Sequence, residues 1–362
     1  MPVDLSKILV VGISSRSLFS LEHENEIFNS AGITAFRKYQ EENENVILDP
    51  GPSFQLVKKL LDLNKISSQQ VVEIVVMSSN SPQTGMRVMH SIKAHNLDIT
   101  RMAFTGGQPI SSYLPGYGVD LFLSRDEDDV QKVIDSKLAA AAIILNAPEK
   151  INNNPDVVKF GFDADEVLFT SSEYRYQTEG LDAFLKHEKE NENVPLPEGP
   201  FAKFLLKLSH IQQYLPGPEE LSPLKAAIIT ARSGDAIQRV VNTLKEWGVY
   251  IHEIHFLGGL SKDKILEAAA VDFFCDDSEA HLVPASKKVP TGKVPYATGS
   301  EMKNLKKYQS LKKIFTENGI TLFHHRMYSL FYDRPKAYIS CYFIIYKVEY
   351  IFIVFFKLPT KN

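Results

Sequence analysis

The chain has 362 residues, of which 44% are hydrophobic, and a formal net charge of -4. This length can bury the cores of two domains of ordinary size. Lys and Arg are spread along the chain rather than gathered in one block, which argues against nucleic acid as a partner. Two cysteines, Cys275 and Cys341, provide neither a disulfide framework nor zinc-finger spacing, and they fit a reducing, cytoplasmic setting.

The first predicted element is the apolar run ILVVGI at residues 8–13. This run is too short for the hydrophobic region of a signal peptide, and no cleavage site follows it. We therefore expect a buried strand. The polar stretch SSRS, residues 14–17, follows it directly.

The chain then repeats itself. FRKYQEENENV at 36–46 returns as FLKHEKENENV at 184–194, with seven of eleven positions identical. GVDLFLSRDED at 118–128 likewise matches AVDFFCDDSEA at 270–280. The offset of about 148 to 152 residues holds across several such pairs, so residues 7 to about 285 are interpreted as two copies of one unit.

Each copy alternates short apolar runs with helical patterns. In the second copy the runs are VVKFGF, KAAIIT, YIHEIHF and VDFFC, and the helix AIQRVVNTLKEWG is predicted to end at Gly248. Such alternation predicts parallel sheets with helices on both faces. Ligands of these sheets bind beyond the carboxyl ends of the strands, so the polar residues that end each run are candidate site residues.

These ends carry an acidic group, a hydroxyl and an ammonium. Asp163 and Asp165 follow the first run of the second copy, and strand alternation would place them on the same side. One could then attack a substrate while the other manages a proton. A few carboxylates with room for water and phosphate suit Mg²⁺. The candidate set is Asp163, Asp165, Thr230, Lys262, Asp276 and Asp277.

The segments FDADEV, IITARS, LSKDK and FFCDD appear in the order of the four motifs of the haloacid-dehalogenase-like phosphohydrolases, which the chain resembles. More specifically, SSRSLF, FRKYQEENEN, GPSF, FTGG, HEKENENVPLPEGP and FFCDDSEAH, with a following VPY, resemble the cytosolic 5'-nucleotidase type I family. The resemblance covers residues 7–297. It implies two tandem haloacid-dehalogenase-like Rossmannoid α/β units, of which the first is degenerate and the second catalytic.

The resemblance also implies a reaction. The expected activity is Mg²⁺-dependent hydrolysis of nucleoside 5'-monophosphates (AMP, IMP and deoxy forms) in the cytoplasm through an aspartyl-phosphate. Asp163 would be the nucleophile and Asp165 the acid and base. Thr230 and Lys262 would clamp the phosphoryl oxygens. Mg²⁺ would be held by Asp163, by the Asp165 carbonyl, and by Asp276 or Asp277, while His281 is expected to form a structural hydrogen bond.

Two alternatives stay open at this point. One is a phosphatase of the same mechanism acting on another small phosphomonoester, such as a sugar phosphate. The other is a non-catalytic nucleotide-binding protein. A homo-oligomer is compatible with the sequence, and a membrane partner is not expected.

The first copy lacks the catalytic groups. Ser14, Ser15 and Arg16 stand where the second copy has its aspartates, Ser124 and Arg125 replace the acidic pair, Ile110 replaces the lysine, and only a hydroxyl remains, at Ser78. This copy should not hydrolyse anything by the same mechanism. It could be a scaffold, one wall of the substrate site, or a regulatory nucleotide site in which Arg16 and the TGG of residues 105–107 contact an anion.

The expected organisation is a degenerate half at 1–150, a catalytic half at 151–300 and an atypical basic and aromatic tail at 301–362. A small helical cap is expected within about 171–222. Its aromatic residues Tyr174, Tyr176 and Phe201 are either core residues or a platform for a purine.

The tail permits several interpretations. A membrane-spanning helix over 337–356 would place Lys347 and Glu349 mid-span, at a cost of ~2.5 to 3.5 kcal/mol each. A strand-forming or disordered appendage and a misread terminal exon are the other interpretations.

Overall fold

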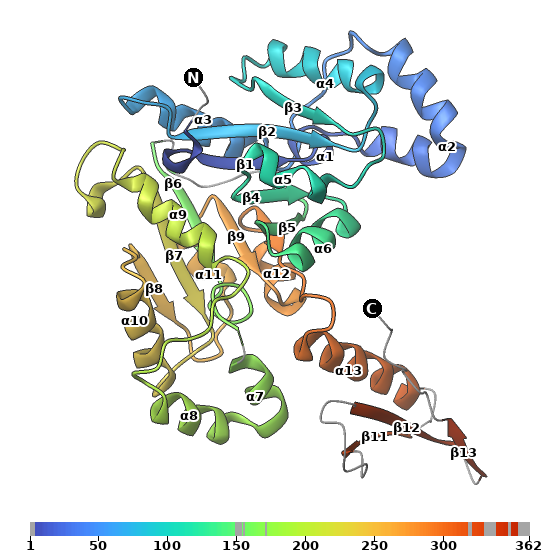
Figure 1. Ribbon diagram of the computed structural model, residues 1–362, viewed down its shortest axis with the longest axis vertical. Coiled ribbons are helices and arrows are strands. Elements are labelled where there is room, and N and C mark those ends of the chain that lie inside the picture. Colours follow the sequence, from blue (N-terminus) through green and yellow to red (C-terminus); the bar gives the residue numbers. More distant parts are fainter. Residues whose placement is uncertain are drawn as a thin grey trace. The chain divides into compact units, whose positions relative to one another are not determined.

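The computed structural model describes residues 4–148, 154, 156–170, 172–317, 321–328, 338–346 and 349–353. The chain divides into two compact units, Met1–Thr298 and Gly299–Asn362. The first unit contains a large α/β sheet, and the second contains a helix and a small sheet (Figure 1).

A ten-stranded sheet forms the centre of the first unit, in the order β3-β2-β1-β4-β5-β10-β9-β6-β7-β8. The first half contains β1 (Leu9–Ile13), β2 (Val72–Ser78), β3 (Arg101–Phe104), β4 (Leu121–Ser124) and β5 (Ala140–Ile144). The second half contains β6 (Val158–Phe162), β7 (Leu224–Thr230), β8 (Glu253–Phe256), β9 (Phe273–Asp276) and β10 (Thr291–Lys293). The predicted apolar runs are therefore confirmed as strands, and every residue of β1 is buried.

Strands are parallel within each half, and the two halves meet at one antiparallel pair, β5 with β10. The carboxyl ends of the first five strands therefore lie at one edge of the sheet, and those of the second five lie at the opposite edge. In Figure 1, β1 and β2 point toward α2, whereas β7 and β8 point toward α8. The fold thus provides two separate strand-end sites.

Helices flank the sheet. Those of the first half are α1 (Ser15–Leu18), α2 (Glu22–Glu42), α3 (Phe54–Ile66), α4 (Pro82–Ala94), α5 (Leu114–Tyr117) and α6 (Glu127–Ser136). Those of the second half are α7 (Ser172–Glu179), α8 (Leu181–Glu190), α9 (Ala202–Gln212), α10 (Ala236–Glu246), α11 (Asp263–Ala268) and α12 (Glu279–Ala285). Short 3-10 turns occur at Leu5–Lys7, Ile110–Ser112 and Glu219–Leu221. Gly248 follows α10 with a φ of 65°, as its predicted role at the helix end requires.

The two halves repeat local details. Helix α2 breaks at Gly32, where φ is 79°, and α7 is separated from α8 by Gly180, where φ is 87°. The Gly51 N–H donates to the Leu18 carbonyl at 2.9 Å, and the Gly199 N–H donates to the Leu168 carbonyl at 2.7 Å. These pairs have the sequence offsets of the repeat.

Reciprocal lysines join the halves. Lys59, on α3, donates to Asp272 Oδ1 and to the Asn154 carbonyl, both at 2.6 Å. Lys207, on α9, donates to the carbonyls of Leu5 at 2.9 Å and Ser6 at 2.7 Å. Each half therefore binds the segment that precedes the other half's first strand.

The second unit contains α13 (Glu301–Glu317) and an antiparallel sheet of β11 (Thr321–Tyr328), β12 (Tyr338–Tyr346) and β13 (Glu349–Ile353). Beyond α13, the described parts of the tail form strands, one of the predicted alternatives, while Lys347 lies outside the described residues. Among the residues described, no helix has the length and apolar character needed to cross a membrane.

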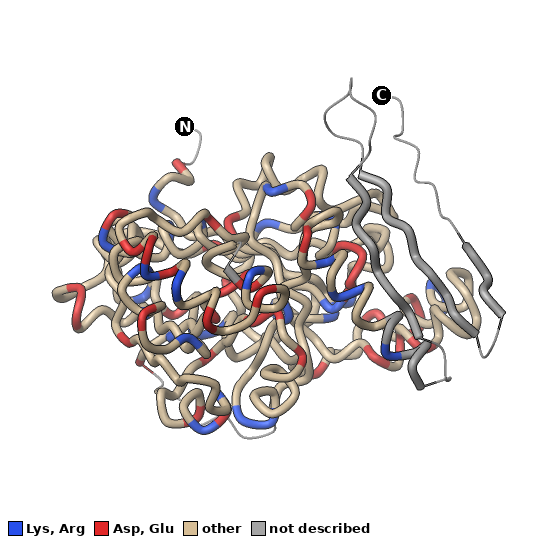
Figure 2. The backbone as a smooth tube through the Cα atoms, turned by 90° about the horizontal axis from the view of Figure 1, so that it is seen from below, with Lys and Arg blue, Asp and Glu red and all other residues tan. Residues whose placement is uncertain are grey.

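Acidic and basic residues are intermixed along the described backbone of the first unit. Figure 2 shows blue and red segments interspersed there, without a continuous basic stripe in the part drawn in colour. The expectation that nucleic acid is not a partner stays a prediction.

Gly199 is predicted to tolerate no side chain. A Cβ added there would lie 2.5 Å from the Val167 carbonyl oxygen and 2.7 Å from the Leu168 carbonyl carbon, both of them backbone atoms that cannot rotate away. We expect Gly199→Ala to destabilise the fold by about 1–3 kcal/mol, measured by urea unfolding. Gly116→Ala is the control, because a Cβ there meets nothing within 4 Å. Equal unfolding midpoints for the two variants would contradict the prediction.

Candidate active site

Three charged side chains meet at the carboxyl ends of the second half's strands. Lys262 Nζ lies 2.8 Å from Asp163 Oδ1 and donates to Asp276 Oδ2 at 2.7 Å. All three residues are buried. Because β6 pairs with β9 in parallel, the residues that follow the pair Phe162 and Cys275 lie side by side. An ammonium between two carboxylates offsets much of the cost of burying them.

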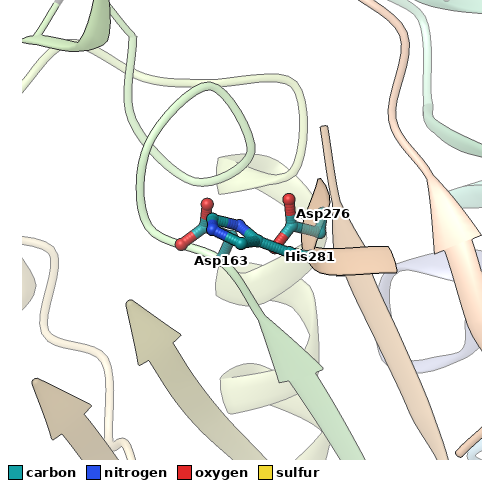
Figure 3. A group of neighbouring side chains, drawn as sticks. All are labelled: Asp163, Asp276 and His281. Carbon is teal, nitrogen blue, oxygen red and sulfur yellow. The ribbon is translucent and has the colours of Figure 1, made fainter. Parts of the chain in front are cut away.

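The acidic part of this group can hold a hard cation. Asp163, Asp276 and His281 each present a ligand atom, and these atoms lie within 4.8 Å of one another (Figure 3). Asp276 Oδ1 accepts the Ser278 N–H at 2.8 Å, and Oδ2 lies 3.2 Å from His281 Nδ1. His281 therefore forms a hydrogen bond with Asp276, as predicted, and its role stays a prediction. Two converging carboxylates match the oxygen ligands that Mg²⁺ prefers.

The surroundings change the proton affinities of these groups. Burial raises the pKa of Asp163 to about 7, although Lys262 acts in the opposite direction. Burial would also raise the pKa of Asp276, but Lys262 and His281 hold it below its usual value. The two carboxylates offset the burial of Lys262 and raise its pKa to about 12, so the ammonium stays charged.

The second aspartate of the acidic pair has a different partner. Tyr296 donates its hydroxyl to Asp277 Oδ2, and the converging group of Asp163, Asp276 and His281 does not include Asp277. Burial, reinforced by the charges of Asp276 and Asp163, raises the pKa of Asp277 well above its usual value. Sequence reasoning did not assign Tyr296 a role, although it belongs to the VPY segment that carries the family resemblance.

Thr230 ends β7 as predicted and is fully buried. Its hydroxyl oxygen accepts the Arg232 N–H at 3.2 Å. β7 is the neighbour of β6 in the sheet, which places Thr230 at the same edge as Asp163.

Asp165 is held by an arginine. Arg232 donates from Nε to Asp165 Oδ2 at 2.9 Å and from Nη2 to Oδ1 at 2.6 Å, a bidentate arrangement that fixes the carboxylate. In this structure Asp163 and Asp165 therefore bind different cations.

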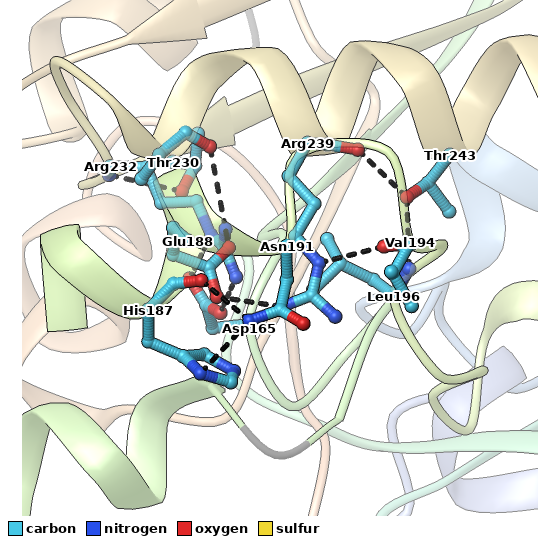
Figure 4. Close-up of polar contacts among 11 residues, drawn as sticks. Asp165, His187, Glu188, Asn191, Val194, Leu196, Thr230, Arg232, Arg239 and Thr243 are labelled. Atoms are coloured by element: carbon cyan, nitrogen blue, oxygen red, sulfur yellow. Dashed lines mark hydrogen bonds and ion pairs between the residues drawn. The ribbon is translucent and has the colours of Figure 1, made fainter.

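The same arginine connects this edge to two helices. Arg232 Nη1 donates to Glu188 Oε2 at 2.6 Å, and Glu188 Oε1 accepts from Arg239 Nη1 at 2.9 Å (Figure 4). Glu188 lies on α8 and Arg239 on α10. Sequence reasoning missed this chain of charges, although Arg232 stands two residues after Thr230 and Glu188 lies in the repeated segment.

Aromatic residues of the predicted cap differ in their exposure to solvent. Phe201 is fully buried and packs on Phe162 and Phe204, with ring centroids 6.1 and 6.0 Å apart, so it is a core residue and not a purine platform. Tyr176 is 44% exposed and meets Phe184 edge-on at 6.1 Å.

A pocket of about 280 Å³ lies at the other edge of the sheet, and it is lined entirely by residues between 14 and 129. Because β5 and β10 are antiparallel, this pocket and the Asp163 group lie at opposite edges. The residues that line this pocket therefore lie away from the Asp163 group, and the interpretation of the first half as one wall of the substrate site stays a prediction.

Glu188 is predicted to be required for folding. It is fully buried between two arginines, and Glu188→Gln would leave Arg239 without a carboxylate partner and Arg232 with Asp165 alone. We expect a loss of about 3–5 kcal/mol in unfolding free energy. Glu190→Gln, on the same helix, removes only an exposed pair with Lys186 at 3.9 Å and should change stability by less than ~0.5 kcal/mol. A Glu188→Gln protein as stable as Glu190→Gln in a urea titration would refute this assignment.

Known proteins resemble this chain over the same region. The model of the 5'-nucleotidase family matches residues 1–301. The human protein named cytosolic 5'-nucleotidase 1B is 33% identical over 289 residues, which are 77% of this chain and 47% of that protein. The chain thus spans about half the length of this curated relative. No solved structure matches the chain. The match across most of the chain shows that it belongs to the 5'-nucleotidase family.

Proposed function

We propose that this protein is a Mg²⁺-dependent 5'-nucleotidase that hydrolyses AMP, IMP and their deoxy forms to nucleoside and phosphate. The observation that carries the proposal is the buried group of Asp163, Lys262 and Asp276 at the strand ends of a member of this family. An anionic nucleophile, a fixed ammonium and a second carboxylate are what phosphoryl transfer through an aspartyl-phosphate requires.

Asp163 is the proposed nucleophile. Its carboxylate oxygen forms a bond to phosphorus while the bond between phosphorus and the 5'-oxygen breaks. Asp165 gives a proton to the departing oxygen and then takes one from the water that splits the acyl phosphate. Lys262 and Thr230 bind the phosphoryl oxygens. Since Arg232 holds both oxygens of Asp165, the acid acts only after this ion pair loosens.

Asp163 and Asp276 would hold the metal ion, with the Asp165 carbonyl and Asp277 as further candidate ligands. The donor set fits Mg²⁺, because the converging atoms of these two residues are carboxylate oxygens. When bound, the ion supplies positive charge that lowers repulsion between the phosphate and the carboxylates. His281 keeps Asp276 oriented through its hydrogen bond.

The two halves are proposed to be copies of one haloacid-dehalogenase-like unit, with a degenerate copy at 1–150 and a catalytic copy at 151–300. Support comes from the matched strand order, the matched helix breaks at Gly32 and Gly180, and the reciprocal lysines. Helices α7 and α8 are the proposed cap of the catalytic copy. α9 contributes Phe204 and Leu208 to the core, so it belongs to the layer that covers the sheet.

The proposed partner is a nucleoside monophosphate, and the proposed compartment is the cytoplasm. The human relative's name describes a cytosolic enzyme, and the two cysteines of this chain fit a reducing setting.

Asp163→Asn should abolish turnover. The amide cannot form the acyl phosphate, so we expect phosphate release from AMP to fall by about 10⁴-fold or more. Asp98→Asn, at an exposed loop position, is the matched control and should retain full activity. EDTA should stop the wild-type reaction, and added Mg²⁺ should restore it.

A substrate panel of AMP, IMP, CMP, UMP, dAMP and glucose 6-phosphate tests the substrate class. Release from glucose 6-phosphate alone would retain the mechanism and reject the nucleotidase. Release by Asp163→Asn at the wild-type rate would reject the mechanism.

Tyr176 is predicted to contact the base. Its exposed ring lies on the proposed cap, and stacking on a base contributes enough that Tyr176→Ala should raise KM for AMP about five- to tenfold with little change in kcat. Tyr113→Ala removes a ring that is 41% exposed elsewhere and serves as the control. The same KM for both variants would exclude Tyr176 from the site.

A further inference from the structure

The pocket of the first half has the same place in its half as the Asp163 group has in the second. The Ser14 N–H donates to the Leu123 carbonyl at 2.9 Å, and the Asp163 N–H donates to the Cys275 carbonyl at 2.8 Å. Ser14 and Asp163 thus occupy matching positions after β1 and β6. We propose that this pocket binds a nucleoside monophosphate, without hydrolysing it and without a metal ion, a property that goes beyond the proposed catalytic function.

Electrostatics favours metal-free binding of phosphate here. Ser14 stands in place of Asp163, and Ser124 in place of Asp276, so the two carboxylates that would repel a phosphate are absent from these positions. Two further hydroxyls that line the pocket, those of Ser15 and Ser78, lie 3.2 Å apart and can donate to phosphate oxygens.

Arg16 provides the positive charge. It lines the pocket and uses Nη2 to bind Glu22 Oε2 at 3.0 Å, while its buried Nε has no hydrogen-bond partner among the described residues. A guanidinium with an unused donor beside several hydroxyls is suited to bind a phosphate. The cation is part of the chain, so no bound ion is needed.

Gln40 gives a second, independent indication of a ligand. This residue lines the pocket and is only 3% exposed, and its Oε1 accepts no hydrogen bond from the described residues. In the second half, the carboxylate of its counterpart Glu188 forms ion pairs with two arginines. In the first half Asn80 takes the place of Arg232, and Glu24 binds Arg87 at 2.6 Å. The side-chain Oε1 of Gln40 can therefore accept a hydrogen bond from an amine or hydroxyl of a ligand.

The aromatic lining of the pocket suits a nucleoside. Phe28 and Phe36 of α2 line it and meet edge-on at 5.9 Å, repeating the pair Tyr176 and Phe184 of the second half. An aromatic pair that is partly exposed can pack against a flat base.

Three carboxylates also line the pocket: Glu24, which is paired with Arg87, and Asp126 and Asp129. Asp126 accepts the Asp129 N–H at 2.9 Å, and burial, together with the charge of Asp126, raises the pKa of Asp129 to about 6. Carboxylates of this kind accept hydrogen bonds from ribose hydroxyls. The volume of about 280 Å³ is close to the lower end of the range of about 300–1,000 Å³ that small-molecule sites occupy.

Calorimetric titration of AMP into the full chain in EDTA tests the proposal. All proteins carry Asp163→Asn, so that no turnover occurs. We expect Arg16→Gln to weaken AMP binding about tenfold, as the loss of a charge-assisted hydrogen bond should. Ser14→Asp should weaken AMP binding at least as much while leaving adenosine binding unchanged. Arg101→Gln is the control, because Arg101 has a similar exposure and a single pair with Glu73 at 2.9 Å.

Equal AMP affinity in Arg16→Gln and Arg101→Gln proteins would overturn the proposal, as would an absence of AMP binding in EDTA. Adenosine binding as tightly as AMP would also overturn it, because Arg16 would then contact no phosphate. Binding is measured without turnover, so a failure of this proposal can be distinguished from a failure of the proposed hydrolysis. If the Ser14→Asp variant fails to fold, the comparison of the two arginine variants still decides.

Discussion

The candidate active site depends on one ammonium group. Asp163 follows β6 and Asp276 ends the neighbouring parallel strand β9, and their carboxylates would repel each other at a buried edge if nothing lay between them. Lys262 contacts both, and it enters from the segment between β8 and α11. The positions of β6, β9 and this segment are thus linked by two ion pairs. In the proposed reaction the same ammonium binds the phosphoryl group, so one contact serves both folding and chemistry.

A second set of charges links the proposed acid to the proposed cap. Arg232 binds Asp165 on one side and Glu188 of α8 on the other, and Glu188 in turn binds Arg239. Movement of α8 would therefore disturb the partner of Asp165. Under the proposed mechanism, release of the acid and displacement of the cap become one event. Proton transfer from Asp165 to the departing 5'-oxygen would then be coupled to substrate entry, although the substrate does not contact Arg239.

The sequence predicts the group at the strand ends better than the orientation of its members. The order of apolar runs brings Asp163, Lys262 and Asp276 together, since carboxyl ends of parallel strands share an edge. It does not predict that Asp165 faces Arg232. Strand alternation places Asp163 and Asp165 on one side, but β6 ends at Phe162, so the rule does not extend to residue 165. The sequence also does not predict the antiparallel pairing of β5 with β10, because β10 consists of the three residues TGK, which carry little strand signal.

The two halves show how one arrangement of strands and helices can carry two kinds of site. Both halves keep the strand end, the broken helix pair and its aromatic contact. What differs is the presence of charge at matching positions: neutral Ser14 stands in place of Asp163, Gln40 in place of Glu188 and Asn80 in place of Arg232. These changes remove the acids that need a cation and the ion pairs that fix the cap. A half that has lost both can still keep a pocket for the same class of ligand, because shape and hydroxyl donors remain when the reactive carboxylates do not.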